Sequence, residues 1–222
     1  MILALDTTHE YGSIALVGQI SDLPRRDEES IHEPKGFSRI LFARLEALLA
    51  RHGLRPADID CFAAASGPGS FTGVRVGLAC IKGLAEALHK PAIAVSNLEA
   101  LGRFGTAPLR AVVIDARRGE IFGAVYDAAS KLVSPEVVAP FEVWLATLPE
   151  GVTEFICPDP GLLLPPGATL ITPPRAIAAA VAEIATERLA RGDPGDPAAI
   201  DANYVRRSDA ELFWREPPTA SL

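Results

Sequence analysis

Short apolar runs alternate with polar turns through the first part of the chain. Residues 2–5 and 61–65 are unbroken runs of apolar or small residues, which predict buried strands. A turn around residues 10–12 follows the first run, and residues 13–17 resume as a strand, so the chain opens with a hairpin. Residues 18–36 are polar and fit either an edge strand or an exposed loop.

Two further segments alternate with these strands and predict helices. In residues 38–51, Leu41 and Leu45 recur at helical spacing, and Ser38 can cap the helix that carries them. Residues 72–89 form a longer segment that is rich in small residues. The alternation of strands with helical segments favours an α/β fold.

The opening pattern returns about 109 residues later. Residues 111–116 form an apolar strand that contains Asp115 near its end, as the first strand ends at Asp6, and each is followed by a turn and a second strand. An internal repeat of this kind indicates a duplicated fold. We therefore expect two subdomains, residues 1–105 and 106–222, and the sequence leaves open whether the tail of the second packs back on the first.

Glycines, a proline and hydroxyl residues gather in residues 66–75, between a predicted strand and a predicted helix. Glycine lets another backbone or a ligand come close, and Ser70 or Thr72 can cap the helix. The free N–H groups at a helix start suit an anion, but the Gly-Lys-Ser/Thr sequence of Walker loops is missing here. A phosphate-binding loop and a tight structural turn both fit, and the turn is the simpler interpretation.

Gly73 and Gly77 lie four residues apart, so a helix places them on one face. Glycine inside a helix costs about 0.5–1 kcal/mol relative to alanine, and this cost is better tolerated where another element must approach closely. We interpret this face as the contact site of a neighbouring helix, which belongs either to this chain or to a partner.

Two strand–aspartate hairpins that face each other describe the architecture of actin-like ATPases and sugar kinases, whose hairpin turns hold ATP phosphates. On this hypothesis Asp6, Thr7 and Thr8 face phosphate, and Asp115 is the acid of the second half. Residues 116–119 lack the Gly-Gly-Thr run of such loops, and their large side chains would crowd a nucleotide. An ATPase or small-molecule kinase is therefore an alternative, beside a purely structural turn at Asp6.

Composition narrows the range of partners. The chain has 222 residues, a net charge of −7 and no basic block, so it is a poor candidate for gripping nucleic acid alone. Its three cysteines lie far apart in apolar surroundings and predict reduced thiols in a cytoplasmic protein. No two histidines lie three or four residues apart and no long apolar run occurs, so we expect neither a helical metal pair nor a membrane span.

Residues 2–8, 66–75 and 113–120 together resemble the bacterial TsaB (YeaZ) family, and residues 204–206 resemble that family's C-terminal Tyr-x-Arg. The resemblance spans the chain and implies an actin-like (ASKHA, ribonuclease H-like) duplicated fold, with two mixed sheets flanked by helices. Many relatives carry a Glu-His pair before the first long helix, where residues 34–38 here read Pro-Lys-Gly-Phe-Ser. A contact made by that histidine is therefore not expected in this chain.

The resemblance also implies a function. Members of the family belong to the complex that adds threonylcarbamoyl to adenosine 37 of tRNA, as non-catalytic partners of TsaD. TsaD binds a metal through His-x-x-x-His, which this chain lacks, and TsaE is the ATPase of the set. We therefore expect a scaffold subunit that pairs with TsaD or, alone, with a second copy. It would contact tRNA only through the complex and have no cofactor of its own, with ATP or ADP only at an interface.

The residues expected at the partner interface come from the two predicted helices and the glycine-bearing loop. They are Leu41, Leu45, Gly67, Gly69, Ser70, Phe71, Thr72, Gly73, Arg75 and Gly77. No catalytic or metal-binding residue is predicted. Asp6, Thr7, Thr8 and Asp115 are retained only as weak phosphate-loop candidates.

Overall fold

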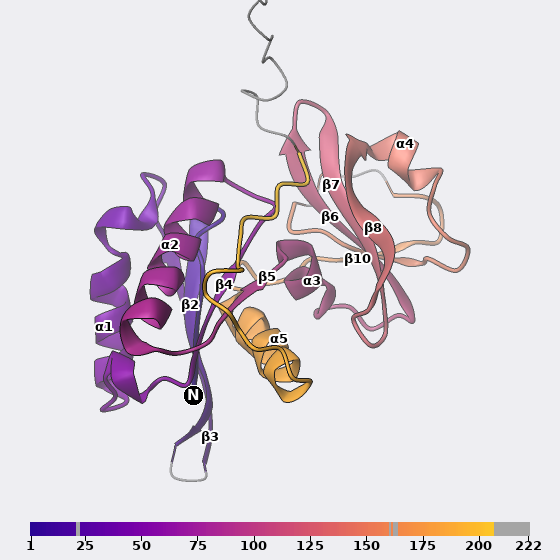
Figure 1. Ribbon diagram of the computed structural model, residues 1–222. Coiled ribbons are helices and arrows are strands. Elements are labelled where there is room, and N and C mark those ends of the chain that lie inside the picture. Colours follow the sequence, from indigo (N-terminus) through magenta and orange to yellow (C-terminus); the bar gives the residue numbers. More distant parts are fainter. Residues whose placement is uncertain (21–22, 160, 162–163, 207–222) are drawn as a thin grey trace, which may run out of the picture.

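The computed structural model describes residues 1–20, 23–159, 161 and 164–206, which contain two five-stranded sheets (Figure 1). The first sheet has the strand order β3 (Leu23–His32), β2 (Tyr11–Ile20), β1 (Ile2–Asp6), β4 (Cys61–Ala65) and β5 (Ala92–Val95). The second has the order β8 (Leu132–Pro140), β7 (Glu120–Asp127), β6 (Leu109–Arg117), β9 (Glu154–Ile156) and β10 (Thr169–Ile171).

Both sheets follow one plan. The first strand of each half pairs antiparallel with the second strand, as β1 does with β2 and β6 with β7. On its other side it pairs parallel with the fourth strand of its half, as β1 does with β4 and β6 with β9. The repeat in the sequence is therefore a duplication of one mixed-sheet unit, and the predicted duplicated α/β fold is confirmed.

The polar stretch that the sequence left open forms the edge strand β3, which pairs antiparallel with β2 along its whole length. Ion pairs tie this strand to α1 (Leu41–Arg51): Glu29 accepts hydrogen bonds from Arg44 and Arg51 at 3.1 and 2.9 Å. Pro24 and the charged side chains also suit an edge, because they discourage pairing with another chain.

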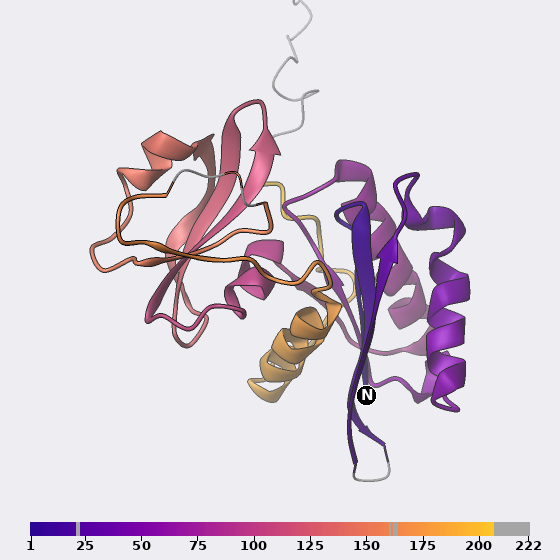
Figure 2. The same ribbon diagram turned by 180° about the vertical axis from the view of Figure 1, so that it is seen from behind.

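Helices cover both faces of the first sheet (Figures 1 and 2). On one face, α1 and α2 (Phe71–Leu88) pack side by side, and on the other lies α5 (Ala178–Ala190). The expected helix start at Ser38 is instead a 3-10 turn, and α1 begins at Leu41. The remaining helices of the described residues are α3 (Asn97–Gly102), α4 (Phe141–Leu145) and the 3-10 turns Phe37–Arg39 and Pro56–Asp58.

One apolar core joins the two halves. Ala4 and Ala63 of the first sheet and Val112 of the second contribute to it, together with α3 and the alanine-rich face of α5. The small side chains let α5 lie close against β1 and β4. This shared core fixes the two sheets to each other on one side of the molecule.

Because of this packing, α5 groups with the first sheet, whereas the expected division at residue 105 assigns it to the second subdomain. Polar contacts hold the start of α5 there. Ser13 Oγ of β2 accepts hydrogen bonds from the N–H groups of Ile177 and Ala178 at 3.1 and 2.9 Å. The chain thus returns to its first half after completing the second sheet.

Two expected interface residues lie in the core instead. Leu41 and Leu45 are 2% and 4% exposed, and they pack between α1 and the first sheet. Helical periodicity therefore identified the buried face of α1. It could not tell whether the sheet of this chain or a partner covers that face, and the partner interpretation is wrong for these two residues.

Gly73 and Gly77 also face inward. A Cβ atom on Gly73 would lie 2.0 Å from the carbonyl oxygen of Thr7, and one on Gly77 would lie 2.6 Å from Thr7 Oγ1. The close approach expected at this helix face is therefore made by the β1–β2 turn of the same chain and not by a partner helix.

This contact predicts that alanine substitutions at two glycines of α2 have very different effects on the free energy of unfolding. Gly73→Ala should lower the free energy of unfolding by about 3 kcal/mol or more, because the new methyl group meets backbone that cannot yield. Gly83→Ala is the matched control, since no atom of the described residues lies within 4 Å of a Cβ atom there, and it should stabilise by about 0.5–1 kcal/mol. Urea titration measures both, and equal effects would contradict the assignment.

Candidate functional site

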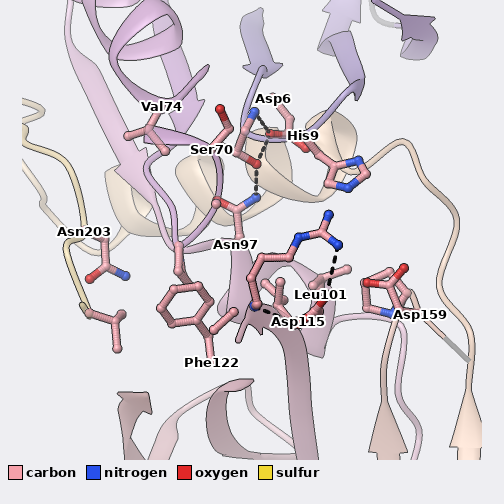
Figure 3. A pocket seen from close by; sticks show the side chains of 18 of the residues that line it. Asp6, His9, Ser70, Val74, Asn97, Leu101, Asp115, Phe122, Asp159 and Asn203 are labelled. Atoms are coloured by element: carbon pink, nitrogen blue, oxygen red, sulfur yellow. Dashed lines mark hydrogen bonds and ion pairs between the residues drawn. The ribbon is translucent and has the colours of Figure 1, made fainter. Parts of the chain in front are cut away.

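A cavity of about 890 Å³ lies between the two halves. The β1–β2 turn and the loop before α2 form one wall, and the β6–β7 hairpin contributes to the other. In Figure 3, Asp6 and Ser70 lie on the first wall, across the cavity from Asp115 and Phe122. The structure thus brings the aspartates of the two repeated strands to one site.

Asp6 is 3% exposed and is engaged within its own turn. Its Oδ1 atom accepts hydrogen bonds from the N–H and Oγ1 of Thr8 at 2.9 and 2.7 Å. Thr8 Oγ1 in turn accepts a hydrogen bond from Asn97 Nδ2 at 2.7 Å. Burial raises the pKa of the Asp6 carboxyl above its ordinary value, while hydrogen bonds from Thr8 and Asn97 oppose the rise. These contacts favour the structural-turn interpretation of Asp6.

Three N–H groups in and just after the loop before α2 donate hydrogen bonds to protein atoms. Gly67 N donates to Asn97 Oδ1 at 2.8 Å. Ser70 N donates to the carbonyl of Thr8 at 2.7 Å, and Ser70 Oγ accepts from Gly73 N at 3.3 Å. Of the two candidate caps, Ser70 is therefore the one that caps α2. These three hydrogen bonds fit the interpretation of the loop as a tight turn.

Behind the first wall, the backbone of the β1–β2 turn packs directly against the backbone of the loop and the first turn of α2. Thr7 is 2% exposed, and its Oγ1 donates to the carbonyl of Gly73 at 2.7 Å. A Cβ atom on Gly69 would lie 2.7 Å from the carbonyl oxygen of Thr8. Gly69 and Gly73 are thus required by the neighbouring β1–β2 turn.

The second hairpin turns tightly and brings large side chains to the cavity. Asp115 Oδ1 accepts a hydrogen bond from Arg117 N at 2.7 Å, and Asp115 Oδ2 pairs with the Arg117 guanidinium at 3.2 Å. Arg117, Arg118 and Gly119 have φ angles of 63°, 58° and 77°. Both arginines line the cavity.

Phe71, Thr72 and Arg75 remain accessible at the start of α2. The Arg75 guanidinium lies 3.7 Å from the centre of the Phe71 ring. Tyr204, from the last described residues, completes this cluster, because its hydroxyl accepts a hydrogen bond from Arg75 Nε at 3.0 Å and its ring lies 5.8 Å from that of Phe71.

Sequence reasoning does not identify three of the residues that line the cavity, namely Asn97, Phe122 and Asn203. The amide of Asn97 joins Gly67 and Thr8, which are 30 and 89 residues away in the chain. No local spacing encodes contacts of this range. The Tyr-x-Arg resemblance at residues 204–206 is the signal that lies nearest to Asn203.

Other chemistry has little support in the described residues. No three of their His, Cys, Asp or Glu side chains are grouped closely enough for a metal ion, and none of their helices is long and apolar enough to cross a membrane. Burial raises the pKa of Cys61 to about 12 and those of Cys80 and Cys157 to about 11. Buried thiols with raised pKa values are poor nucleophiles.

The raised pKa of Asp6 predicts how stability depends on pH. Between about pH 4 and the higher pKa of the folded state, the folded chain holds a proton that the unfolded chain has lost, so stability falls as pH rises. The asparagine in Asp6→Asn cannot ionise, so the variant should not lose stability in this way. The free energy of unfolding of the variant, relative to that of the parent, should therefore increase with pH across that range.

Asp27→Asn is the control with the opposite sign, because the hydrogen bond with His52 lowers the pKa of Asp27. The parent gains stability from that carboxylate above the ordinary aspartate pKa and loses it as pH falls through the lowered one. Chemical denaturation of the parent and both variants from pH 3 to pH 8 tests the pair. Parallel pH profiles for the parent and Asp6→Asn would refute the assignment at Asp6.

Comparisons with known proteins agree with this architecture. The family model for TsaD, described as tRNA N6-adenosine threonylcarbamoyltransferase, matches residues 33–155. A solved structure described as YeaZ from Pseudomonas aeruginosa superposes with a TM-score of 0.78 at 27% identity, over 91% of this chain and 98% of that chain.

Two curated relatives carry the name tRNA threonylcarbamoyladenosine biosynthesis protein TsaB. The one from Bacillus subtilis is 33% identical over 154 residues, which is 67% of this chain and 66% of the relative. The one from Haemophilus influenzae is 37% identical over 127 residues, 54% of this chain and 51% of the relative. The matched stretches thus span between half and two thirds of these relatives. With the fold, these findings establish that the chain belongs to the TsaB (YeaZ) family.

Proposed function

We propose that this chain is a non-catalytic subunit of the machinery that forms N6-threonylcarbamoyladenosine at position 37 of tRNA, and that it acts by pairing with TsaD. Its membership in the TsaB family supports a role in this modification. The observation that supports a non-catalytic role is that both aspartates of the cavity are already bound by side chains or backbone of their own turns. Asp6 is occupied by Thr8, and Asp115 is occupied by Arg117.

The alternative is an actin-like ATPase or small-molecule kinase that uses Asp6 and Asp115. Such an enzyme needs carboxylates that are free to act on Mg²⁺ or a nucleophile, together with room for a nucleotide. Calorimetry with Mg-ATP on the isolated protein separates the two hypotheses. We expect no binding in the micromolar range, and micromolar binding that Asp6→Ala abolishes would overturn the non-catalytic assignment.

For the pairing surface we propose the outward face of α1 and α2. Phe42 of α1 is 62% exposed, and on α2 the exposed residues Arg75, Ala79 and Gly83 recur at helical spacing. Small residues let two helices approach closely, and exposed aromatic and arginine side chains are frequent in protein interfaces. This face replaces the one that contains Gly73 and Gly77, which the β1–β2 turn covers.

The other expected partners follow from this role. We propose that the same face serves either TsaD or a second copy of this chain, so that the two compete, and that TsaE joins the pair with TsaD. ATP or ADP would be held only at an interface with a partner subunit. Because the net charge is −7, tRNA would be contacted through the complex, which would work in the cytoplasm.

Ala79→Arg tests the surface. A charge placed in the middle of a dry helix–helix contact costs several kcal/mol, so affinity for TsaD should fall by a hundredfold or more, on the order of 3 kcal/mol. Ala190→Arg, an exposed alanine on α5, is the matched control and should bind normally. The melting temperatures of both variants should equal that of the parent.

Titration calorimetry with TsaD gives these affinities, and a tRNA modification assay with TsaD, TsaE and the enzyme that makes threonylcarbamoyl-adenylate gives the activity. Normal TsaD binding by Ala79→Arg would show that the surface is wrong. If tRNA modification proceeds equally well without this protein, the proposed function is refuted.

A further inference from the structure

Residues 200–206, here called the strap, run from the first half of the molecule to the second (Figure 1), and the last four of them line the cavity. Two anchors hold its beginning to the first half. Ile200 and Ala202 pack against the core formed by α1, α2 and the first sheet. Asn203 N donates to the carbonyl of Ser66, which directly follows β4, at 2.8 Å.

Asn203 and Arg206 hold the strap to the second half. Asn203 Nδ2 donates to Glu136 Oε2 of β8 at 2.5 Å. Arg206 donates to the carbonyl of Ala116 at 2.8 Å and to the carboxylate of Glu120, so it binds both strands of the β6–β7 hairpin. The side chain of Asn203 also lies within 3.4 Å of the Gly67 carbonyl in the first half, so this residue contacts both halves.

The second-half anchors are partly buried and charge-assisted, which makes them stronger than surface contacts. The side chains of Arg206 and Glu120 are 23% and 36% exposed. Glu136 also accepts hydrogen bonds from Tyr126 OH at 3.0 Å and from Ser96 Oγ, just before α3. The strap thus joins a polar network at the connection between the halves.

The position of the strap relative to the shared core suggests its role. Leu101 and Ile177 belong to that core and line the cavity, and Asn203 and Arg206 of the strap line the cavity as well. The shared core and the strap therefore both line the cavity, between the β1–β2 turn and the loop before α2 on one wall and the β6–β7 hairpin on the other. A body joined by a packed core can open by hinge motion unless a second tie holds it.

We infer that the strap sets the angle between the two halves, and that release of its Asn203 and Arg206 anchors opens the cavity by rotation about the shared core. The inference concerns the isolated chain and does not depend on TsaD or on the proposed function. It assigns a conformational role to Asn203 and Arg206.

Hydrogen exchange on the full chain tests the strap, with Arg206→Ala and Asn203→Ala as the two variants. The reporters are the N–H groups of Thr8 and Ser70, which lie on the first wall and are not bonded to the strap. We expect about tenfold faster exchange at these reporters, as for the loss of one hydrogen bond to a charged group. Small-angle scattering should show a larger radius of gyration.

Arg191→Ala is the matched control, because this exposed arginine pairs, among the described residues, with Glu187 of α5 and does not line the cavity. Reporter exchange equal to that of the control in both variants would overturn the inference. So would faster exchange throughout the buried strands β1 and β4, because that result would mean general destabilisation.

Glu120→Gln keeps the test independent of how well Arg206→Ala folds. It weakens the same anchor from the other side, so it should also speed exchange at the reporters. Combined with Arg206→Ala, it should add little further effect, because Arg206→Ala already removes the contact that Glu120→Gln weakens. Additive effects of the two substitutions would contradict the anchor.

Discussion

The contact between the β1–β2 turn and the start of α2 fixes the position of this helix against the first sheet. The carbonyl of Thr7 lies where a side chain on Gly73 would be, and Thr7 Oγ1 donates to the carbonyl of Gly73 at 2.7 Å. Ser70 N completes the contact by donating to the carbonyl of Thr8 at 2.7 Å. Helix and turn are thus in backbone contact, which only glycine allows at this position.

This contact decides the roles of the two faces of α2. The glycine face is used up within the chain, so the surface left for a partner is the opposite one, with Arg75, Ala79 and Gly83. The same contact uses the N–H group of Ser70, which donates to the carbonyl of Thr8. One packing requirement therefore explains both why glycines occupy the inner face of α2 and why Arg75, Ala79 and Gly83 lie on its exposed face.

The sequence predicts the parts of the fold that local patterns encode. The apolar strands that contain Asp6 and Asp115, each followed by a turn and a second strand, are sufficient to predict the duplicated fold. What the sequence does not predict depends on contacts across long separations, such as Arg206 with Ala116, 90 residues apart. Helical spacing likewise marks Leu41 as buried without telling which molecule buries it, since an apolar face is the same whether it meets its own sheet or a partner.

The strap connects the two features that matter most for the proposed role. Tyr204 lies between its two second-half anchors, Asn203 and Arg206, and its hydroxyl accepts a hydrogen bond from Arg75 at the start of α2. The residue that meets the outward helix face is therefore part of the segment that ties the halves together. A subunit that acts by presenting a surface benefits from holding that surface in one arrangement, because a rigid partner loses less conformational entropy on binding.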